Sequence, residues 1–262
     1  MQSGRKIEFE RLLMTRQNHH RPTYQAGWPP ERFIVPLLAK RVPSLFEEWG
    51  AGNGKGQPAL DAGCGAQPFR HMIEGSGYIY RSFDVVQNQA GSVDFLGALD
   101  APLPADCLAG GPYAFIMATE VLEHVAGWEL AFANLARLLA PAGRVLLSCP
   151  HVYPPHEEPY DFWRPTTNAV AYHAKQNGLV VKHMERAGGP HDVLGTILED
   201  TQCYPAFNTL KSRGCGWVVR FVRKQMLRIL HDSNWRRLVE FRGGFYLSCI
   251  AILEKSNTTT DA

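Results

Sequence analysis

The chain has 262 residues, 45% of them hydrophobic, and a formal net charge of +2 at pH 7. This length and apolar content can bury one substantial core, so we expect one domain with elaborations rather than two independent domains. The small net charge gives no support to a nucleic-acid partner, because proteins that bind duplexes usually carry a concentrated basic face.

The cysteines and the N-terminal segment indicate the cellular compartment. The 6 cysteines lie far apart without CxxC spacing, and most sit in apolar runs, where a cysteine behaves as a small hydrophobic residue. The N-terminal segment is polar and charged, without the apolar stretch of a signal peptide. No stretch is long enough and apolar enough to cross a bilayer. We therefore expect a cytoplasmic protein with reduced thiols.

The first 56 residues are expected to form a helical cap over a site. Helices are predicted over 5–16 and 30–49, joined by a loop that contains Pro22, Gly27 and Trp28. A glycine-rich stretch then separates this cap from the first residues with a strong strand pattern.

Strand and helix patterns alternate along the following segment. Strands are predicted at 58–62, 78–84, 113–118, 143–149, 179–184 and 245–254, and helices at 67–75, 127–140 and 167–177. Alternation with short connections predicts parallel strands and crossover helices, hence an open, doubly wound α/β sheet. We assign this core to residues 57–194 plus 244–256. Ligands of such sheets bind at the carboxyl ends of the strands.

Residues 195–243 interrupt the alternation and are too many for a simple loop. Between Lys211 and Arg242 there are nine basic and two acidic residues, a net charge of +7, and the apolar residues have spacings compatible with an amphipathic helix. Together with the N-terminal helices, this insertion is expected to cap the site. Three hypotheses stay open: it covers the protein's own core or forms a homodimer interface, its segment 211–242 lies on an anionic membrane, or it binds RNA.

The run ALDAGCGAQPF combines a strand end with a sharp turn through Gly63 and Gly65, and it should open a helix with Pro68 in the first turn. A dinucleotide site would need a third glycine where Pro68 stands, which weighs against NAD or FAD. Asp61 adds a negative charge that disfavours phosphates and suits a ligand carrying ammonium and sulfonium groups.

At this point the sequence resembles the class I S-adenosylmethionine-dependent methyltransferases, whose first motif reads like LDAGCG, and the resemblance runs from Pro58 to Gly189. It implies a Rossmann-like seven-stranded sheet with six parallel strands and an antiparallel last strand. It also implies that Asp84 accepts hydrogen bonds from the ribose hydroxyls and that Asp100 lies beside the adenine amino group. The residues expected to bind the cofactor are Asp61, Gly63, Cys64, Gly65, Asp84, Val85, Asp100, Ala101, Thr119 and Glu120.

The segment MATEVLEHV is similar to the methyltransferase type 11, or ubiquinone-biosynthesis, group. If it turns helically, Glu120 stacks over Glu123 and His124 and makes one polar patch at the end of a central strand. Since methyl transfer to a hydroxyl needs an aligned acceptor and removal of its proton, His124 is the preferred general base. A histidine that only orients the helix is an equally open interpretation. The predicted catalytic residues are His124, Glu120 and His151.

Two carboxylates and an imidazole can also bind a divalent metal, with His151 completing the set of Glu120, Glu123, His124 and His151. Plant small-RNA 2′-O-methyltransferases have a similar ExxEH arrangement, although Val125 stands where they have a second adjacent histidine. The following stretch, HVYPPHEEPYDFWRPTT, contains His156 and is typical of loops that recognise the acceptor, and Asp161 and Arg164 are expected to form a structural ion pair there.

The predicted function is therefore transfer of a methyl group from S-adenosylmethionine, leaving S-adenosylhomocysteine, to an oxygen or a nitrogen of a small-molecule acceptor in biosynthesis. Two alternatives remain open, a metal-assisted RNA 2′-O-methyltransferase and a non-catalytic S-adenosylmethionine-binding protein. Nucleic acid is the less favoured partner, because no RNA-binding module is recognisable.

Overall fold

The structure, a computed structural model, describes residues 24–52 and 54–256, so the predicted helix at 5–16 lies outside the described residues. Its helices are α2 (Glu31–Trp49), α3 (Arg70–Gly75), α4 (Ala105–Ala109), the 3₁₀ helix η1 (Leu122–His124), α5 (Trp128–Leu138), α6 (Thr167–Gln176), α7 (Pro190–Asp200), α8 (Leu210–His231) and α9 (Ser233–Leu238). Its strands are β1 (Pro58–Ala62), β2 (Ile79–Asp84), β3 (Phe95–Leu96), β4 (Tyr113–Thr119), β5 (Leu139–Pro150), β6 (Leu179–Ala187) and β7 (Ser248–Lys255).

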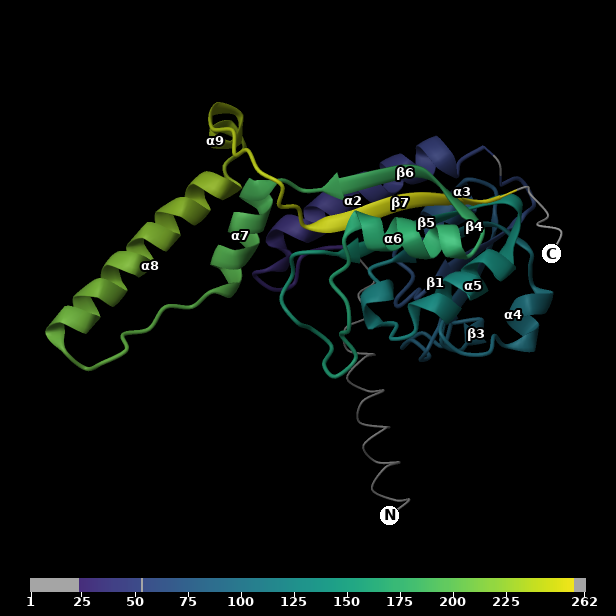
Figure 1. The fold of residues 1–262 in the computed structure, drawn as a ribbon, viewed down its shortest axis with the longest axis horizontal. Helices are drawn as coiled ribbons and strands as arrows, with labels where there is room; N and C mark the ends of the chain where they lie inside the picture. The colour runs from purple at the N-terminus through teal and green to yellow at the C-terminus, as the bar shows by residue number, and fades with distance from the viewer. Residues whose placement is uncertain (1–23, 53, 257–262) are drawn as a thin grey trace, which may run out of the picture.

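The strands form a seven-stranded sheet in the order β3-β2-β1-β4-β5-β7-β6 (Figure 1). β1 pairs in parallel with β2 and β4, β2 with β3, and β4 with β5. β7 runs antiparallel to both of its neighbours, β5 and β6. The predicted fold class, with a reversed last strand, is therefore confirmed. The short strand β3 has no counterpart among the predicted elements, because two residues carry no recognisable periodicity.

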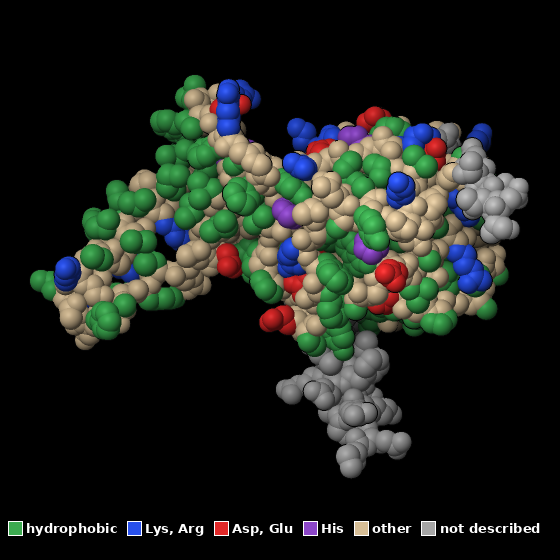
Figure 2. Space-filling model, in the orientation of Figure 1, with side chains coloured by type: hydrophobic (Ala, Val, Ile, Leu, Met, Phe, Trp, Pro, Cys, Tyr) green, Lys and Arg blue, Asp and Glu red, His purple; other side chains and the backbone are tan. Residues whose placement is uncertain are grey.

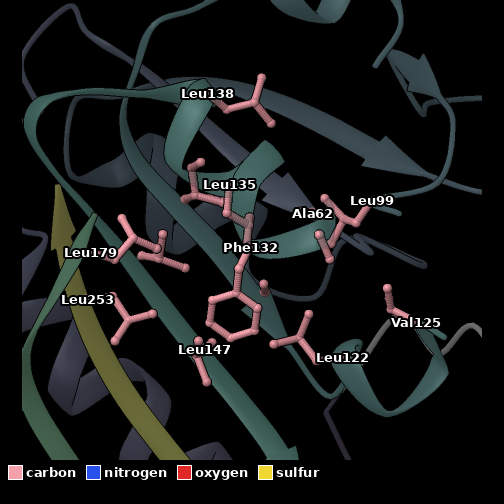
Figure 3. Packing of buried hydrophobic residues seen from close by; sticks show 14 of the residues in the cluster. Ala62, Leu99, Leu122, Val125, Phe132, Leu135, Leu138, Leu147, Leu179 and Leu253 are labelled. Carbon is pink, nitrogen blue, oxygen red and sulfur yellow. The ribbon is translucent and has the colours of Figure 1, made fainter. Parts of the chain in front are cut away.

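Helices cover both faces of the sheet. On one face, Phe132 of α5 packs in a cluster that includes Leu147 of β5 and residues of α4 and α6 (Figure 3). On the other face, Phe46 of α2 packs in a cluster that includes Leu146 of β5 and residues of α3 and α7. Successive residues of a strand thus point to opposite faces of the sheet and pack in different clusters. Because both faces are covered, the central strands are almost continuously apolar. Because α2 is part of this packing, it belongs to the core as well as to the predicted cap.

Several predicted boundaries need correction. The helix expected at 67–75 begins only at Arg70, because Gln67 has a left-handed φ of 61° that a helix cannot include, and Pro68 lies in the turn before it. The predicted domain boundary after residue 194 falls inside α7, which runs to Asp200. The cysteines are free, as expected, and four of them are buried.

The predicted amphipathic helix at 211–242 exists as α8 and α9, but it does not cap a site. Figure 1 shows α8 projecting away from the sheet. It packs mainly on α7 and α9, and at its C-terminal end the His231 ring stacks on Phe33 of α2 with centroids 4.6 Å apart. Arg223 donates hydrogen bonds to the carbonyl oxygens of Leu198 and Glu199, which attaches α8 to the end of α7 that lies away from the sheet. In the described part of the chain, no helix combines the length and the apolar character needed to span a membrane.

Candidate functional site

The loop after β1 is shaped by two glycines at the carboxyl edge of the sheet. Gly63 and Gly65 have φ values of 72° and 49°, in the left-handed region. A Cβ atom at Gly63 would lie 2.2 Å from Cγ2 of Val121, so a larger residue would collide with the segment that follows β4. The glycine loop therefore packs directly against the segment that follows β4.

Asp61 lies near the end of β1 with a side chain that is 3% exposed. Its Oδ2 accepts a hydrogen bond of 2.8 Å from the Tyr80 hydroxyl. Burial raises the pKa of Asp61 to about 7, the Tyr80 hydrogen bond partly opposes this, and the charge of Asp84 adds to it. A cation beside Asp61 would favour the ionised carboxylate and lower this pKa.

Asp84 and Asp100 fix the loops on the other side of the glycines. Oδ2 of Asp84 accepts from the Gly65 N–H at 2.9 Å, and its Oδ1 accepts from the Val86 N–H at 3.3 Å. Asp100 Oδ2 accepts from the Gly127 N–H at 3.0 Å, just before α5. Both carboxylates also line a cavity, so they are available to a ligand there.

Two cavities adjoin along this edge of the sheet. The larger has a volume of about 600 Å³ and the smaller about 450 Å³. They share the lining residues Gly63, Gly65, Glu120, His124 and Glu157. We call the two together the cleft. It lies at the carboxyl ends of β1, β2 and β4, where ligands of doubly wound sheets bind.

The cleft is strongly acidic. Its described lining includes no lysine and no arginine. The carboxylates that line it are Glu31, Asp61, Asp84, Asp100, Glu120 and Glu157. Six acids in a wall whose described residues include no lysine or arginine favour a cationic ligand and repel phosphate groups.

Glu120 stands where the two cavities meet. Its φ of 52° lies in the left-handed region, so it is not part of the 3₁₀ helix η1 and does not stack over Glu123 and His124 as predicted. Instead its Oε1 accepts hydrogen bonds from Ser148 at 2.7 Å and from Ser248 at 3.3 Å. Burial raises the pKa of Glu120 to about 7, although both serine hydrogen bonds lower it.

Glu123, His124 and His156 form a second polar group, in which one ligand atom of each residue lies within 4.8 Å of the others. The structure thus groups His156 with Glu123 and His124, whereas the predicted metal set combined these two residues with Glu120 and His151. Nδ1 of His151 bonds to the Pro165 carbonyl oxygen at 2.9 Å, and its ring stacks on Tyr246 with centroids 4.2 Å apart. These contacts hold His151 outside both the group and the cleft lining.

An ion pair orders the loop that carries His156. Arg164 donates to both carboxylate oxygens of Asp161 at 2.6 Å, and this is the structural pair that the sequence predicts. Asp161 in turn accepts a hydrogen bond from the His156 N–H at 2.9 Å. The same loop is attached to η1, where the Glu123 carbonyl oxygen accepts from the Phe162 N–H at 2.8 Å.

The cleft brings together most of the residues expected from the sequence. The expected residues that line one or both cavities are Asp61, Gly63, Cys64, Gly65, Asp84, Val85, Asp100, Thr119, Glu120 and His124. Ala101, which was also expected to bind the cofactor, lies outside the lining. The sequence did not predict the N-terminal wall, formed by Tyr24, Trp28, Glu31, Ile34, Val35 and Leu38. The sequence predicted a helical cap over the site in this region, but not which of its side chains line the cleft.

The family comparison matches residues 31–180, more than half of the chain, to a methyltransferase domain. A comparison with curated proteins gave no match.

Solved structures with similar folds cover most of the chain at low sequence identity. A putative sarcosine dimethylglycine methyltransferase from Galdieria sulphuraria has a TM-score of 0.52 and 16% identity, covering 94% of this chain and 98% of that one. An O-methyltransferase from a trans-AT PKS multienzyme of Brevibacillus brevis, in complex with S-adenosyl-L-homocysteine, has a TM-score of 0.53 and 16% identity, covering 87% and 76%. The [4+2]-cyclase SpnF has a TM-score of 0.51 and 15% identity, covering 83% and 81%. These structures share the fold, and the cyclase among them shows that this fold alone does not determine the reaction.

The raised pKa of Asp61 gives a test of the electrostatics of the cleft without any ligand. An aspartate in an unfolded chain has a pKa of about 3.9, so ionised Asp61 opposes folding. The protonated Asp61 carboxyl stabilises the folded protein relative to the ionised one. This stabilisation is fully present below about pH 4 and is lost as the pH rises through about 7. The stability of Asp61→Asn relative to wild type should therefore increase by roughly 2–3 kcal/mol between pH 5 and pH 8.

Urea unfolding of the ligand-free proteins at the two pH values measures this change. Asp106→Asn, at an exposed position on α4, is the control and should show little pH-dependent difference from wild type. A stability difference between Asp61→Asn and wild type that does not change with pH would contradict the raised pKa.

Proposed function

Because the chain belongs to the class I S-adenosylmethionine-dependent methyltransferase family, we propose that it transfers a methyl group from S-adenosylmethionine, bound in the cleft, to a hydroxyl oxygen of a small molecule. The observation that carries this proposal is the acidic wall of the cleft, which has six carboxylates and, among the described residues, no lysine or arginine.

The methyl donor fits the charge and the shape of the cleft. S-adenosylmethionine carries a sulfonium and an ammonium group, and Asp61 and Glu120 are the buried acids whose ionisation a cation would favour. The smaller cavity suits the adenosine part. It combines Asp84 and Asp100 with the apolar side chains of Val85 and Leu99, and an acid at the end of the second strand can accept from ribose hydroxyls.

The acceptor is expected to occupy the larger cavity, on the side of the N-terminal wall. Trp28 and Tyr153, which are in edge contact with ring centroids 6.0 Å apart, give this part an aromatic surface. A volume of about 600 Å³ suits a small molecule. The acidic lining argues against a polyanionic acceptor, and this favours a neutral or cationic small molecule over RNA.

The reaction requires one bond to form and one to break. The acceptor oxygen attacks the methyl carbon in line with the sulfur, the carbon–sulfur bond breaks with its electron pair going to sulfur, and S-adenosylhomocysteine leaves. The hydroxyl proton goes to the Glu120 carboxylate, which lies at the junction of the two cavities and is held by Ser148 and Ser248. Glu120 thus takes the role of general base that the sequence favoured for His124.

Glu120→Gln should reduce methyl transfer by roughly 10²–10⁴-fold, because an amide cannot accept the proton, and should change the affinity for S-adenosylmethionine much less. The assay incubates the protein with S-adenosylmethionine labelled in its methyl group and a whole-cell extract, and counts the label in the small-molecule and RNA fractions. Glu129→Gln, an exposed position on α5, is the matched control and should keep wild-type transfer.

Three outcomes would count against the proposal. Label that appears only in RNA would favour the alternative acceptor, and binding without any transfer would favour a non-catalytic cofactor-binding protein. Unchanged transfer by Glu120→Gln would remove Glu120 from the role of base.

A further inference from the structure

We infer that Glu123, His124 and His156 bind a divalent transition-metal ion in the wall of the larger cavity. The three residues come from two segments, η1 and the loop after β5, which are held together by hydrogen bonds. His124 and His156 line the cavity, while the Glu123 side chain behind them is fully buried. A metal here would therefore be attached to the protein on one side and open to a cavity ligand on the other.

The first observation is an unsatisfied carboxylate oxygen. Oε1 of Glu123 is buried and has no hydrogen-bond partner. It lies 3.9 Å from Nε2 of His124 and 3.9 Å from Nε2 of His156. In a tetrahedral site with bonds of about 2.1 Å, ligand atoms are about 3.4 Å apart. Side-chain shifts of a few tenths of an ångström would thus allow all three atoms to contact one ion.

The second observation is the state of the two imidazoles. Nδ1 of His124 lies 2.8 Å from the Tyr160 carbonyl oxygen, which can only accept, so Nδ1 carries the proton and Nε2 presents a lone pair. Nδ1 of His156 faces two acceptors, the Pro154 carbonyl oxygen at 3.3 Å and Asp161 Oδ2 at 3.4 Å. Hydrogen bonds from Nδ1 to oxygen acceptors are the usual support of histidines that ligate metals through Nε2.

Arg164 does not change this assignment. Its Nη2 lies 3.4 Å from Nδ1 of His156, but it also donates to Asp161 at 2.6 Å and to the Pro154 carbonyl oxygen at 3.0 Å, which uses both of its hydrogens. His156 therefore presents a lone pair on Nε2, as His124 does.

Three acceptor atoms thus converge on one point. A water molecule there has two hydrogens and can satisfy only two of the three, whereas a cation satisfies all of them. Two imidazole nitrogens and one carboxylate oxygen suit Mn²⁺, Co²⁺ or Zn²⁺ better than Mg²⁺ or Ca²⁺, which prefer oxygen ligands. If the proposed methyl transfer holds, the open side of the ion would bind the acceptor hydroxyl and lower its pKa.

Cobalt binding tests the site without any methyl acceptor. The metal-stripped full chain is titrated with Co²⁺, and visible absorption reports imidazole coordination. Wild type should bind one equivalent and gain thermal stability. Glu123→Gln and His156→Ala should each weaken binding by roughly 100-fold. The matched control His71→Ala, an exposed histidine on α3, and His151→Ala, the ligand expected from the sequence, should bind like wild type.

The absence of a cobalt spectrum in wild type, or loss of binding in His151→Ala with retention in His156→Ala, would overturn the inference. Glu123→Gln keeps the shape of the side chain and should remain folded, which melting in the absence of metal checks. Binding of S-adenosylmethionine is measured on the same samples, so a failure of the metal site and a failure of the proposed function are distinguishable.

An independent observation concerns α8, and from it we propose that this helix binds the surface of an anionic lipid bilayer. Its apolar side chains are exposed over a wide arc, and hydrophobic side chains gather on it in Figure 2. Trp217 is 62% exposed and Phe221 is 50% exposed, and their rings stack with centroids 5.6 Å apart. Among the residues of α8, only Gly216 and Leu230 are buried. The helix is therefore long, exposed and without a cover over its apolar arc within the described chain.

The positive charge of α8 and of the segment around it favours an anionic bilayer as the partner of the exposed apolar arc. At 100° per residue, Arg213, Arg220 and Lys224 lie together along one edge of the arc that contains Trp217 and Phe221. The segment from 211 to 242 has nine basic and two acidic residues. A second copy of the chain would bring two such segments together and be opposed by their charge. An anionic bilayer offers an apolar interior for the aromatic rings and negative headgroups for the basic edge.

Co-sedimentation of the full chain with vesicles tests this surface. Vesicles of phosphatidylcholine with 30% phosphatidylserine should bind wild type, and added salt or vesicles of phosphatidylcholine alone should weaken the binding. The double variant Trp217→Ser, Phe221→Ser should lose most of the binding, and Lys224→Gln should lower the partition coefficient about fivefold. The matched control Tyr172→Ser, an exposed aromatic residue on α6, should bind like wild type.

Wild type that does not sediment with anionic vesicles would overturn the proposal. Sedimentation velocity without lipid gives the second check. A stable dimer of wild type that is lost in the double variant would show that another copy of the chain covers the helix instead.

Discussion

The charge of the cleft is the constraint on which the rest of the site depends. Parallel strands end at the same edge of the sheet, so the acids near the ends of β1 and β2 and after β4 lie close to one another. Burial raises the pKa of both Asp61 and Glu120 to about 7, and no lysine or arginine among the described lining residues compensates them. A cationic ligand would supply the missing charge, and an anionic ligand would increase the repulsion.

The hydrogen bonds to Asp61 and Glu120 each use one oxygen of the carboxylate. Tyr80 takes one oxygen of Asp61, and two serines take one oxygen of Glu120. In contrast, the pair of Asp161 and Arg164 is closed on itself and holds the loop in place. Asp84 and Asp100 combine the two roles, because they accept hydrogen bonds from backbone N–H groups and also line the smaller cavity.

Much of the fold and of the cofactor side could be predicted from the sequence, because both depend on local patterns. Apolar runs and glycine positions located β1, β2, β4 and the loop with Gly63 and Gly65. The position of the Glu120 side chain could not be predicted, because its backbone has a left-handed φ and its carboxylate is held by serines of β5 and β7, which are distant in the sequence. Likewise, spacing alone does not show that His156, and not His151, lies beside Glu123 and His124, because this depends on how the loop packs and on the stacking of His151 on Tyr246.

The exposed helix shows another limit of local patterns. Its amphipathic spacing was correctly read as a helix, but whether such a helix covers the core depends on the path of the chain before it. Here α7 carries it away from the sheet, and Arg223 fixes the two helices to each other.

Calorimetric titration with S-adenosylmethionine is the most direct test of the central claim, that the acidic cleft binds this cation through its aspartates. Wild type should bind one equivalent at pH 8. Asp84→Asn, which keeps the size of the side chain but loses the negative charge facing the smaller cavity, should bind at least roughly tenfold more weakly, since hydrogen bonds to charged groups are worth about 1.5–3 kcal/mol. Asp106→Asn should bind like wild type. If wild type does not bind S-adenosylmethionine, or if Asp84→Asn binds it equally well, the account of the cleft is contradicted.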